Sequence, residues 1–99
     1  MNVKPETAVR LQKLDIAWFA TEKGYTMFTR GNCAAVAHQQ SIGSSGLMTE
    51  NGFAYLVWRE DRAYLAGKSG ETEATAEQLE EIQRFSRDLA AALGTASGT

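Results

Sequence analysis

The stretch GLMTENGFAYLVWREDRAYLAG, residues 46–67, decides the fold, because apolar segments alternate in it with two turn signals. Asn51-Gly52 is the pair preferred in a two-residue type I′ hairpin, where both turn positions need a positive φ angle. A second reversal at Glu60-Asp61 has weaker turn chemistry but leads into another apolar segment. The stretch therefore predicts three antiparallel strands joined as a meander.

The two turns predict consistent sides for the side chains of this meander. The first turn sets Leu47 opposite Leu56, and the second sets Leu56 opposite Leu65. A slip of one residue in either hairpin would move half of these side chains to the other side, so the agreement is an internal check. The side expected to face the core carries Leu47, Ala54, Leu56, Trp58, Ala63 and Leu65.

The other side of the meander, which we call the outer face, is apolar as well. The outward side of a sheet is normally polar, so something is expected to cover this one. At its edge Arg59 lies beside Arg62 across the second turn, a mildly repulsive pair. The outer face carries the candidate binding residues Met48, Phe53, Tyr55, Val57, Arg59, Arg62 and Tyr64, with Glu50 at a further edge.

Two kinds of cover for the outer face stay open at this point. The first lies within the chain: either an N-terminal helix through Val9, Leu11 and Leu14, or the first strands wrapped round as a second layer. The second is a protein partner or a second copy of the chain. Tyr, Phe, Met and Arg are enriched at the cores of such interfaces.

A long amphipathic helix is predicted over residues 76–93. Thr75 and Gln78 form a capping-box signature at its start, and Gly94 can end it in the left-handed conformation. Leu79, Ile82, Leu89 and Leu93 recur at three- and four-residue spacing, with Ser86 in the same series and Phe85 and Ala92 beside it. We expect Leu79, Ile82 and Leu89 to bury Leu56, Trp58 and Leu65.

The N-terminal third gives a weaker pattern with alternatives. Residues 14–20 alternate as a strand does, after a short helix over 5–13 that Pro5 opens. One continuous helix within residues 5–23 is the alternative, but it would split the apolar residues into two opposed stripes.

The next segments complete the prediction. Lys23-Gly24 would end a turn into a strand over 25–30. Residues 33–38 suit either a strand or a helix, and a turn at 30–32 favours the strand, whereas SIGSSG over 41–46 is expected to be a loop.

These elements predict a single α+β domain over residues 1–94, followed by a flexible tail at 95–99. The domain combines an antiparallel sheet of about five or six strands with a long C-terminal helix packed on one face. A short N-terminal helix is a possible addition.

Composition excludes several classes of function. Ten Lys and Arg residues against twelve Asp and Glu give a net charge of −2, and the basic residues are scattered, which disfavours nucleic-acid binding. The single cysteine fits a reducing compartment. The N-terminus lacks the apolar core of a signal peptide, and no apolar run approaches the ~20 residues of a membrane span. We therefore expect a cytoplasmic protein that does not act at a membrane.

Sequence motifs for catalysis or cofactor binding are incomplete. Gly67-Lys68-Ser69 lacks the first glycine of a phosphate-binding loop, whose place is taken by Arg62. Cys33 and His38 would fall on opposite sides of a strand, so they form no nucleophile–base pair.

Two further patterns are also incomplete. The Gly-x-Ser-x-Gly pattern that starts at Gly43 ends on Leu47. The acidic cluster has the character of a solvated helix start rather than a metal site; it comprises Glu71, Glu73, Glu77, Glu80 and Glu81. No cofactor, no metal and no catalytic residue is assigned from the sequence.

Two stretches, GSSGLMTENGFAYLVWR at 43–59 and QRFSRDLAAAL at 83–93, resemble stretches of short, uncharacterised proteobacterial proteins. The resemblance covers most of the residues from about 25 onward. It implies a bacterial source, but it implies no activity.

The sequence thus favours a small non-enzymatic protein, a protein-interaction or regulatory module that acts through the outer face and can form a homodimer. The alternative is a small-molecule-binding domain, with the ligand between sheet and helix near Trp18, Trp58 and SIGSSG.

Overall fold

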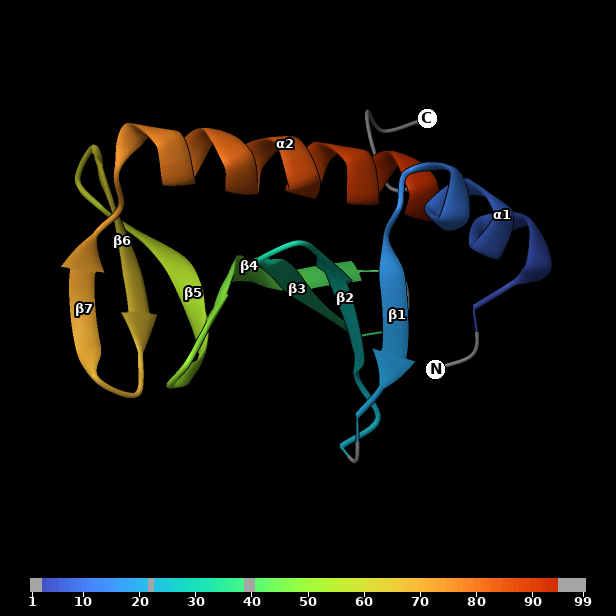
Figure 1. Cartoon of the computed structure of the whole chain (residues 1–99), viewed down its shortest axis with the longest axis horizontal. Helices are drawn as coiled ribbons and strands as arrows, with labels where there is room; N and C mark the ends of the chain where they lie inside the picture. The colour runs from blue at the N-terminus through green and yellow to red at the C-terminus, as the bar shows by residue number, and fades with distance from the viewer. Residues whose placement is uncertain (1–2, 22, 39–40, 95–99) are drawn as a thin grey trace.

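The computed structural model describes residues 3–21, 23–38 and 41–94, and within them the chain folds into one antiparallel sheet and two helices (Figure 1). The strands are hydrogen-bonded in chain order from β1 to β7. The α+β class and the antiparallel sheet are confirmed, but the sheet has seven strands rather than five or six. The elements are α1 (Pro5–Lys13), β1 (Ala17–Ala20), β2 (Thr26–Arg30), β3 (Cys33–His38), β4 (Ser41–Thr49), β5 (Gly52–Arg59), β6 (Arg62–Gly67), β7 (Gly70–Glu73) and α2 (Ala76–Leu93). The predicted tail at 95–99 lies outside the described residues.

The seventh strand, β7, was missed because its sequence has no apolar alternation. Gly67 pairs with Gly70 across a turn at Lys68-Ser69, and Gly70 has the positive φ of 112° that this hairpin needs. GETE is therefore a strand, not a connection to α2. Glu71 and Glu73 meet their arginine partners only in the folded sheet, so the spacing of residues in the sequence does not reveal this strand.

The prediction of a loop at SIGSSG was wrong, because these residues form the first part of β4. Ser44 pairs with Val36, while a bulge between Val36 and Ala37 leaves Gly43 without a direct partner. The Gly and Ser residues have low strand propensity, but the exposed backbone of β3 needs a neighbour. Pairing across the sheet overrides the local preference.

The first hairpin of the meander is shifted by two residues from its predicted register. Leu47 pairs with Ala54 rather than Leu56, and Gly52 alone has a positive φ, of 107°. The backbone N–H of Asn51 donates to the Thr49 hydroxyl at 3.1 Å, which centres the turn one residue earlier. Because the shift is an even number of residues, each side chain keeps its predicted face.

The second hairpin has the predicted register. Leu56 pairs with Leu65 and Trp58 with Ala63, and Glu60 accommodates the turn with a φ of 60°. The strand over 33–38 is also confirmed.

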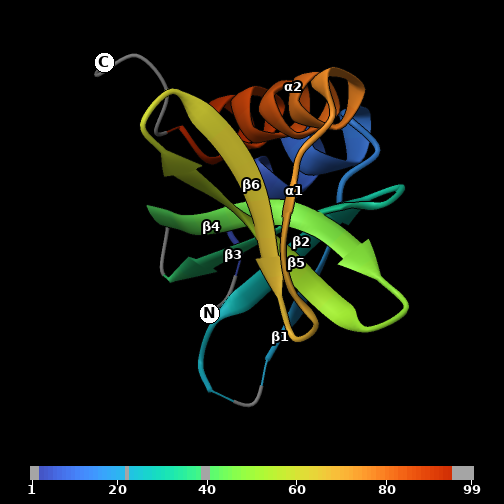
Figure 2. The same ribbon diagram turned by 90° about the vertical axis from the view of Figure 1, so that its left-hand side faces the viewer.

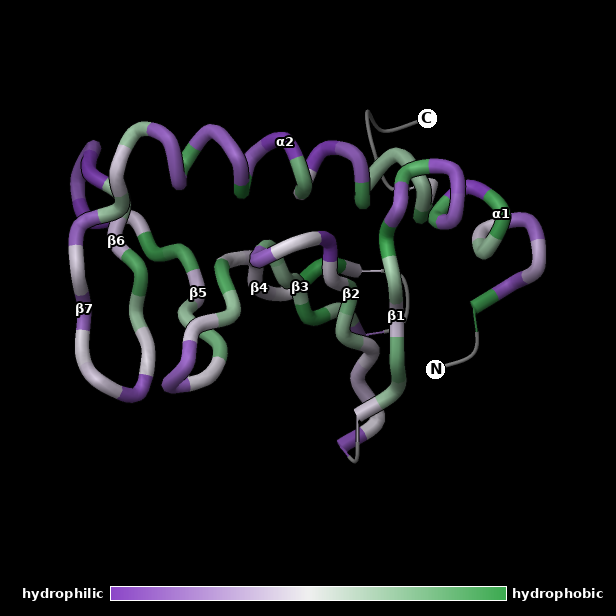
Figure 3. The backbone as a smooth tube through the Cα atoms, viewed as in Figure 1, coloured by the Kyte–Doolittle hydropathy of each residue, from purple (hydrophilic) through white to green (hydrophobic). Residues whose placement is uncertain are grey.

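Helix α2 has the predicted bounds, because its ends are fixed by local chemistry. The Thr75 hydroxyl accepts from the Gln78 N–H at 3.0 Å and the Gln78 side chain accepts from the Thr75 N–H at 2.9 Å, while Gly94 ends the helix with a φ of 75°. Figure 3 shows its hydrophobic residues turned toward the sheet and its hydrophilic residues turned away. The buried ones are Ile82, Phe85, Leu89, Ala92 and Leu93.

Helix α1 lies against the C-terminal end of α2, on the same side of the sheet (Figure 2). Leu11 is fully buried there, and the Arg10 Nε donates to the Ala92 carbonyl oxygen at 2.8 Å. A left-handed Asp15, with φ 59°, ends this segment before the buried Ile16 and strand β1. The helix-then-strand alternative is thus confirmed for the described part of residues 5–23, although the strand begins at Ala17 rather than at residue 14.

The expectation that Leu56 and Trp58 are fully buried under α2 was wrong. Leu56 is only partly buried, and Trp58 is 53% exposed although it lies on the core side. The helix crosses β3 and β4, whereas Trp58 stands near the far end of β5, beside the second turn. The predicted burial of Leu65 is confirmed, and Leu47 is also buried on the predicted core side. The core under α2 further contains Cys33, Ala35 and Ala37 of β3, which were not predicted to lie there.

Gly46 is predicted to be essential for folding, because strands β4 and β5 approach closely there. A Cβ at this position would lie 1.9 Å from the Ala54 carbonyl oxygen, whereas one at Gly43 would meet the Val36 carbonyl oxygen at an ordinary 3.5 Å. Gly46→Ala should lower the unfolding free energy by about 3 kcal/mol. The matched control, Gly43→Ala, should change it by less than about 1 kcal/mol. Equal urea midpoints for the two variants would contradict the close approach.

Candidate binding surface on the outer sheet face

Among the described residues, neither a helix nor a second layer of strands covers the outer face of the sheet, although the small Ala34 and Ala66 on this face are buried. Both helices lie on the opposite side (Figure 2), and β1 and β2 continue the sheet instead of folding back as a second layer. The predicted cover by the N-terminal helix is therefore wrong. Leu11 is buried beside α2, and Val9 is 50% exposed to solvent.

The residues predicted for this face do lie together on it. Val57 pairs directly with Tyr64 and Met48 with Phe53, and direct partners in a sheet point to the same side. Met48 is 42% exposed and Tyr55 is 43% exposed, unusually high values for large apolar side chains.

The first three strands add further apolar side chains that the sequence analysis did not assign to the outer face. Met27 pairs with Phe19 on one side and with Val36 on the other, which places all three on this face. Phe19 is 54% exposed. Their period-two spacing was visible in the sequence, but their side could be assigned only after β1–β3 were known to join the meander edge to edge.

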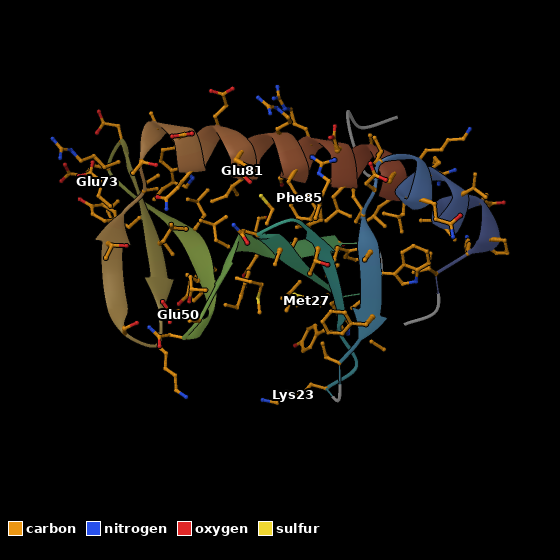
Figure 4. All side chains as sticks on the ribbon, viewed as in Figure 1. Lys23, Met27, Glu50, Glu73, Glu81 and Phe85 are labelled. Carbon is orange, nitrogen blue, oxygen red and sulfur yellow. The ribbon has the colours of Figure 1, made fainter. Side chains whose placement is uncertain are left out.

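The outer face lies on the inside of an arch formed by the strands. In Figure 1, β1 and β2 at one end and β5–β7 at the other descend from the central strands, away from α2. Figure 4 shows Met27 and Glu50 on this side, and Phe85 and Glu81 on the side of the helix. The central strands carry small outer-face residues, Ala34, Ser44 and Gly46, so the middle is lower than its walls.

A pocket of about 290 Å³ lies in this hollow, lined by Tyr25, Val36, His38, Gly43, Ser44 and Phe53. The Tyr25 and His38 rings meet edge to face, with 5.3 Å between their centroids, and form one wall. Phe53, on β5, also lines the pocket, and the centroid of its ring lies 6.4 Å from that of the Tyr55 ring. Rings from β3, from β5 and from Tyr25, which directly precedes β2, therefore stand around the small residues Gly43 and Ser44.

The two predicted edge arginines are paired with glutamates of β7. Arg59 forms a two-point ion pair with Glu71, and Arg62 Nη1 lies 3.5 Å from Glu73 Oε2. The hydrogen bonds and charge of Arg59 hold the pKa of the Glu71 carboxyl below its usual range. The edge beside the apolar surface is thus polar and nearly neutral rather than basic.

The candidate catalytic pair is not assembled. Cys33 lies on the core side, 2% exposed, and His38 lies on the outer face, so the prediction of opposite faces is confirmed. Burial, followed by the nearby Glu81 carboxylate, raises the pKa of the Cys33 thiol to about 11. This shift opposes formation of the nucleophilic thiolate.

The other motifs also serve structural roles. Gly67-Lys68-Ser69 belongs to the β6–β7 hairpin and leads into a strand, not into the helix N-terminus that a phosphate-binding loop requires. In the described ranges, no group of three or more His, Cys, Asp or Glu side chains could hold a metal ion.

The alternative site between sheet and helix is only partly formed. A cavity of about 270 Å³ beside α2 is lined by Trp58, Leu56, residues 43–45 and three residues of the helix, Ile82, Gln83 and Ser86. Trp18 does not line it. The Ser45 and Ser86 hydroxyl oxygens lie 3.4 Å apart at its base.

Comparisons with protein-family models, with curated proteins and with solved structures found no match, so the surface is interpreted from its own geometry. Within the described part of the chain, neither helix has the length and apolar character needed to cross a membrane.

Cys33 is predicted to be a structural residue whose protonation contributes to stability. Its folded pKa of about 11 exceeds the ordinary 9.0, so the folded state binds the proton more tightly. This proton contributes to the unfolding free energy fully below pH ~9, and the contribution is lost as the pH rises to ~11. The loss should be about 1–2 kcal/mol, because solvent screens the exposed Glu81 carboxylate. Cys33→Ala should lack this part of the alkaline decline in urea titrations.

Thiol labelling gives an independent check of the same prediction. The native thiol should react with a disulfide reagent at pH 8 far more slowly than the thiol of the urea-unfolded chain. Labelling at equal rates in the two states would show that Cys33 is accessible and ionised, contrary to the prediction.

Proposed function

We propose that this chain is a small, non-enzymatic cytoplasmic protein whose outer sheet face binds another protein. The observation that carries the proposal is the position of both helices on one side of the sheet, which leaves Phe19, Met48 and Tyr55 between 42% and 54% exposed on the other. Large apolar side chains exposed on one sheet face support an interaction role, because soluble monomers rarely expose large apolar patches that are not interaction sites.

The composition and edges of the surface support this role. Tyr, Phe and Met supply the large side chains around its hollow and the ion-paired Arg59 and Arg62 lie at its margin, and these residue types are enriched at protein interfaces. A second copy of the chain is one partner that this surface can accept. The buried, protonated Cys33 fits a reducing compartment such as the cytoplasm.

The small-molecule alternative has less support. The cavity of about 270 Å³ beside α2 is lined largely by small and polar residues, among them Ser45, Gln83 and Ser86, whereas ligand pockets are lined mostly by apolar and aromatic side chains. The space between the middle of α2 and the sheet is filled by Ile82, Phe85 and Leu89, each at most 1% exposed.

A double substitution on the outer face tests the proposal. Val57→Lys with Tyr64→Glu replaces a direct cross-strand pair by opposite charges, so it avoids like-charge repulsion between neighbours. The folded state should persist by circular dichroism, with a loss of about 1 kcal/mol or less, while association with a partner or second copy should disappear. Unfolding of this variant would mean that the face is internal core.

Site-specific photo-crosslinking in the native host identifies the partner. A photoreactive phenylalanine analogue at Tyr55 should give a discrete adduct, whose mass distinguishes a second copy from another protein. The matched control is Val9, which is 50% exposed on α1, away from the outer face. The adduct should be absent there, and should be lost when the charged pair at Val57 and Tyr64 is present. Adducts equal at the two positions would contradict the proposal.

A further inference from the structure

The ring-lined pocket on the outer face differs from the rest of that surface because it is concave and carries polar groups. Val36 and Phe53 provide apolar walls, and Tyr25, His38 and Ser44 each bring a group that can donate or accept a hydrogen bond. The pocket adjoins the bulge between Val36 and Ala37, and a bulge can change the direction in which a neighbouring side chain points.

The size of the pocket matches one aromatic ring system. A dry cavity of about 150 Å³ holds a benzene molecule, so 290 Å³ accommodates a substituted single ring or a fused pair of rings. The pocket is too small to enclose a nucleotide or an acyl chain.

The walls favour an aromatic guest over an aliphatic one of equal volume. The edge-to-face contact of Tyr25 with His38 and the ring of Phe53 across from it provide both ring edges and ring faces. Aromatic pairs in such arrangements gain affinity beyond the burial of apolar area. The Ser44 hydroxyl can meet a polar substituent on the guest.

We propose that this pocket is the anchor site of the outer face and receives one aromatic side chain, such as Tyr, from a polypeptide partner. The proposal rests on the interaction role proposed above and specifies the chemistry of the partner. Exposed apolar side chains continue beyond the pocket, at Met48 and Tyr55. A polypeptide that places one aromatic side chain in the pocket can cover them with its neighbouring residues, whereas a free aromatic molecule would leave them exposed. Pockets filled by aromatic anchors are the usual energetic centres of protein interfaces.

Titration with defined probes, followed through the backbone amide signals of Val36 and Ser44 in NMR spectra, tests this assignment. The probes are p-cresol, the acetylated and amidated peptide Val-Thr-Tyr-Thr-Val, and the same peptide with Leu or Ala in the centre. The Tyr peptide should bind at least ~10-fold more tightly than p-cresol and at least ~3-fold more tightly than the Leu peptide, and the Ala peptide should cause no shift.

Each other outcome of the titration overturns the inference in a specific way. Equal affinities for p-cresol and the Tyr peptide would identify a site for free aromatic molecules. Equal affinities for the Leu and Tyr peptides would remove the aromatic preference, and no shift with any probe would remove the site.

Substitutions in the pocket separate this inference from the proposed function. Ser44→Phe should fill the pocket and abolish binding of the Tyr peptide, whereas Thr29→Phe, a ring added on the same face outside the lining, should leave it unchanged. His38→Ala, at an exposed strand end, should weaken binding of the Tyr peptide by ~3- to 10-fold. This variant keeps the test valid if Ser44→Phe does not fold.

If Ser44→Phe and His38→Ala leave peptide binding intact, the pocket is not the anchor. If partner association then still requires Val57 and Tyr64, the proposed function stands without it.

Discussion

The burial of one apolar stripe of α2 against the central strands is the contact on which the rest of the structure depends. Phe85 and Leu89 are fully buried there, and the small side chains of Cys33 and Ala35 on β3 let the helix approach the sheet closely. An 18-residue helix is about 27 Å long, close to the ~29 Å width of seven hydrogen-bonded strands. One helix laid across the strands therefore extends over most of the width of the sheet (Figure 1), but it packs mainly against β3 and β4.

Polar contacts fix the position of this helix. The Arg30 guanidinium lies 5.5 Å from the centre of the Phe85 ring, and Arg30 Nη1 is 2.9 Å from Asp88 Oδ2. The same nitrogen donates to the Leu14 carbonyl oxygen at 3.1 Å, at the end of α1. One arginine on β2 thus joins the sheet to both helices, and both are held on the core side.

The uncovered outer face follows from this arrangement. Once α1 and α2 are committed to one side, the described residues contain no other helix to place on the opposite side, although the strands there carry Met27, Tyr55 and Val57. The strands curve away from the helix, and small residues in β3 and β4 leave a hollow between aromatic walls. A chain of this size thus keeps a concave apolar surface while its core is complete.

Strand β7 controls both the edge of the sheet and the charge beside the outer face. Its alternating Glu71 and Glu73 reach Arg59 and Arg62, whose mutual repulsion across the second hairpin would otherwise be unrelieved. Charged side chains on an edge strand also discourage pairing with a further strand. This protection leaves the face of the sheet, rather than the β7 edge, as the surface suited to binding.

Local chemistry made part of this structure predictable from the sequence alone. The capping box at Thr75 and the left-handed Gly94 define α2 without any other part of the chain, because their hydrogen bonds span only a few residues. Period-two alternation likewise assigned Tyr55 and Val57 to the outer face, and the two-residue shift of the first hairpin did not change that assignment.

Only the tertiary structure decided the features that depend on distant partners. SIGSSG became a strand because its backbone pairs with β3, and GETE became β7 because its backbone pairs with β6, where its glutamates also reach Arg59 and Arg62. The placement of Leu11 beside α2 determined that the outer face stays open, and the joining of β2, β3 and β5 formed the pocket. Sequence patterns specify which way a side chain points along its own strand or helix. Contacts between elements far apart in the chain decide what it meets there.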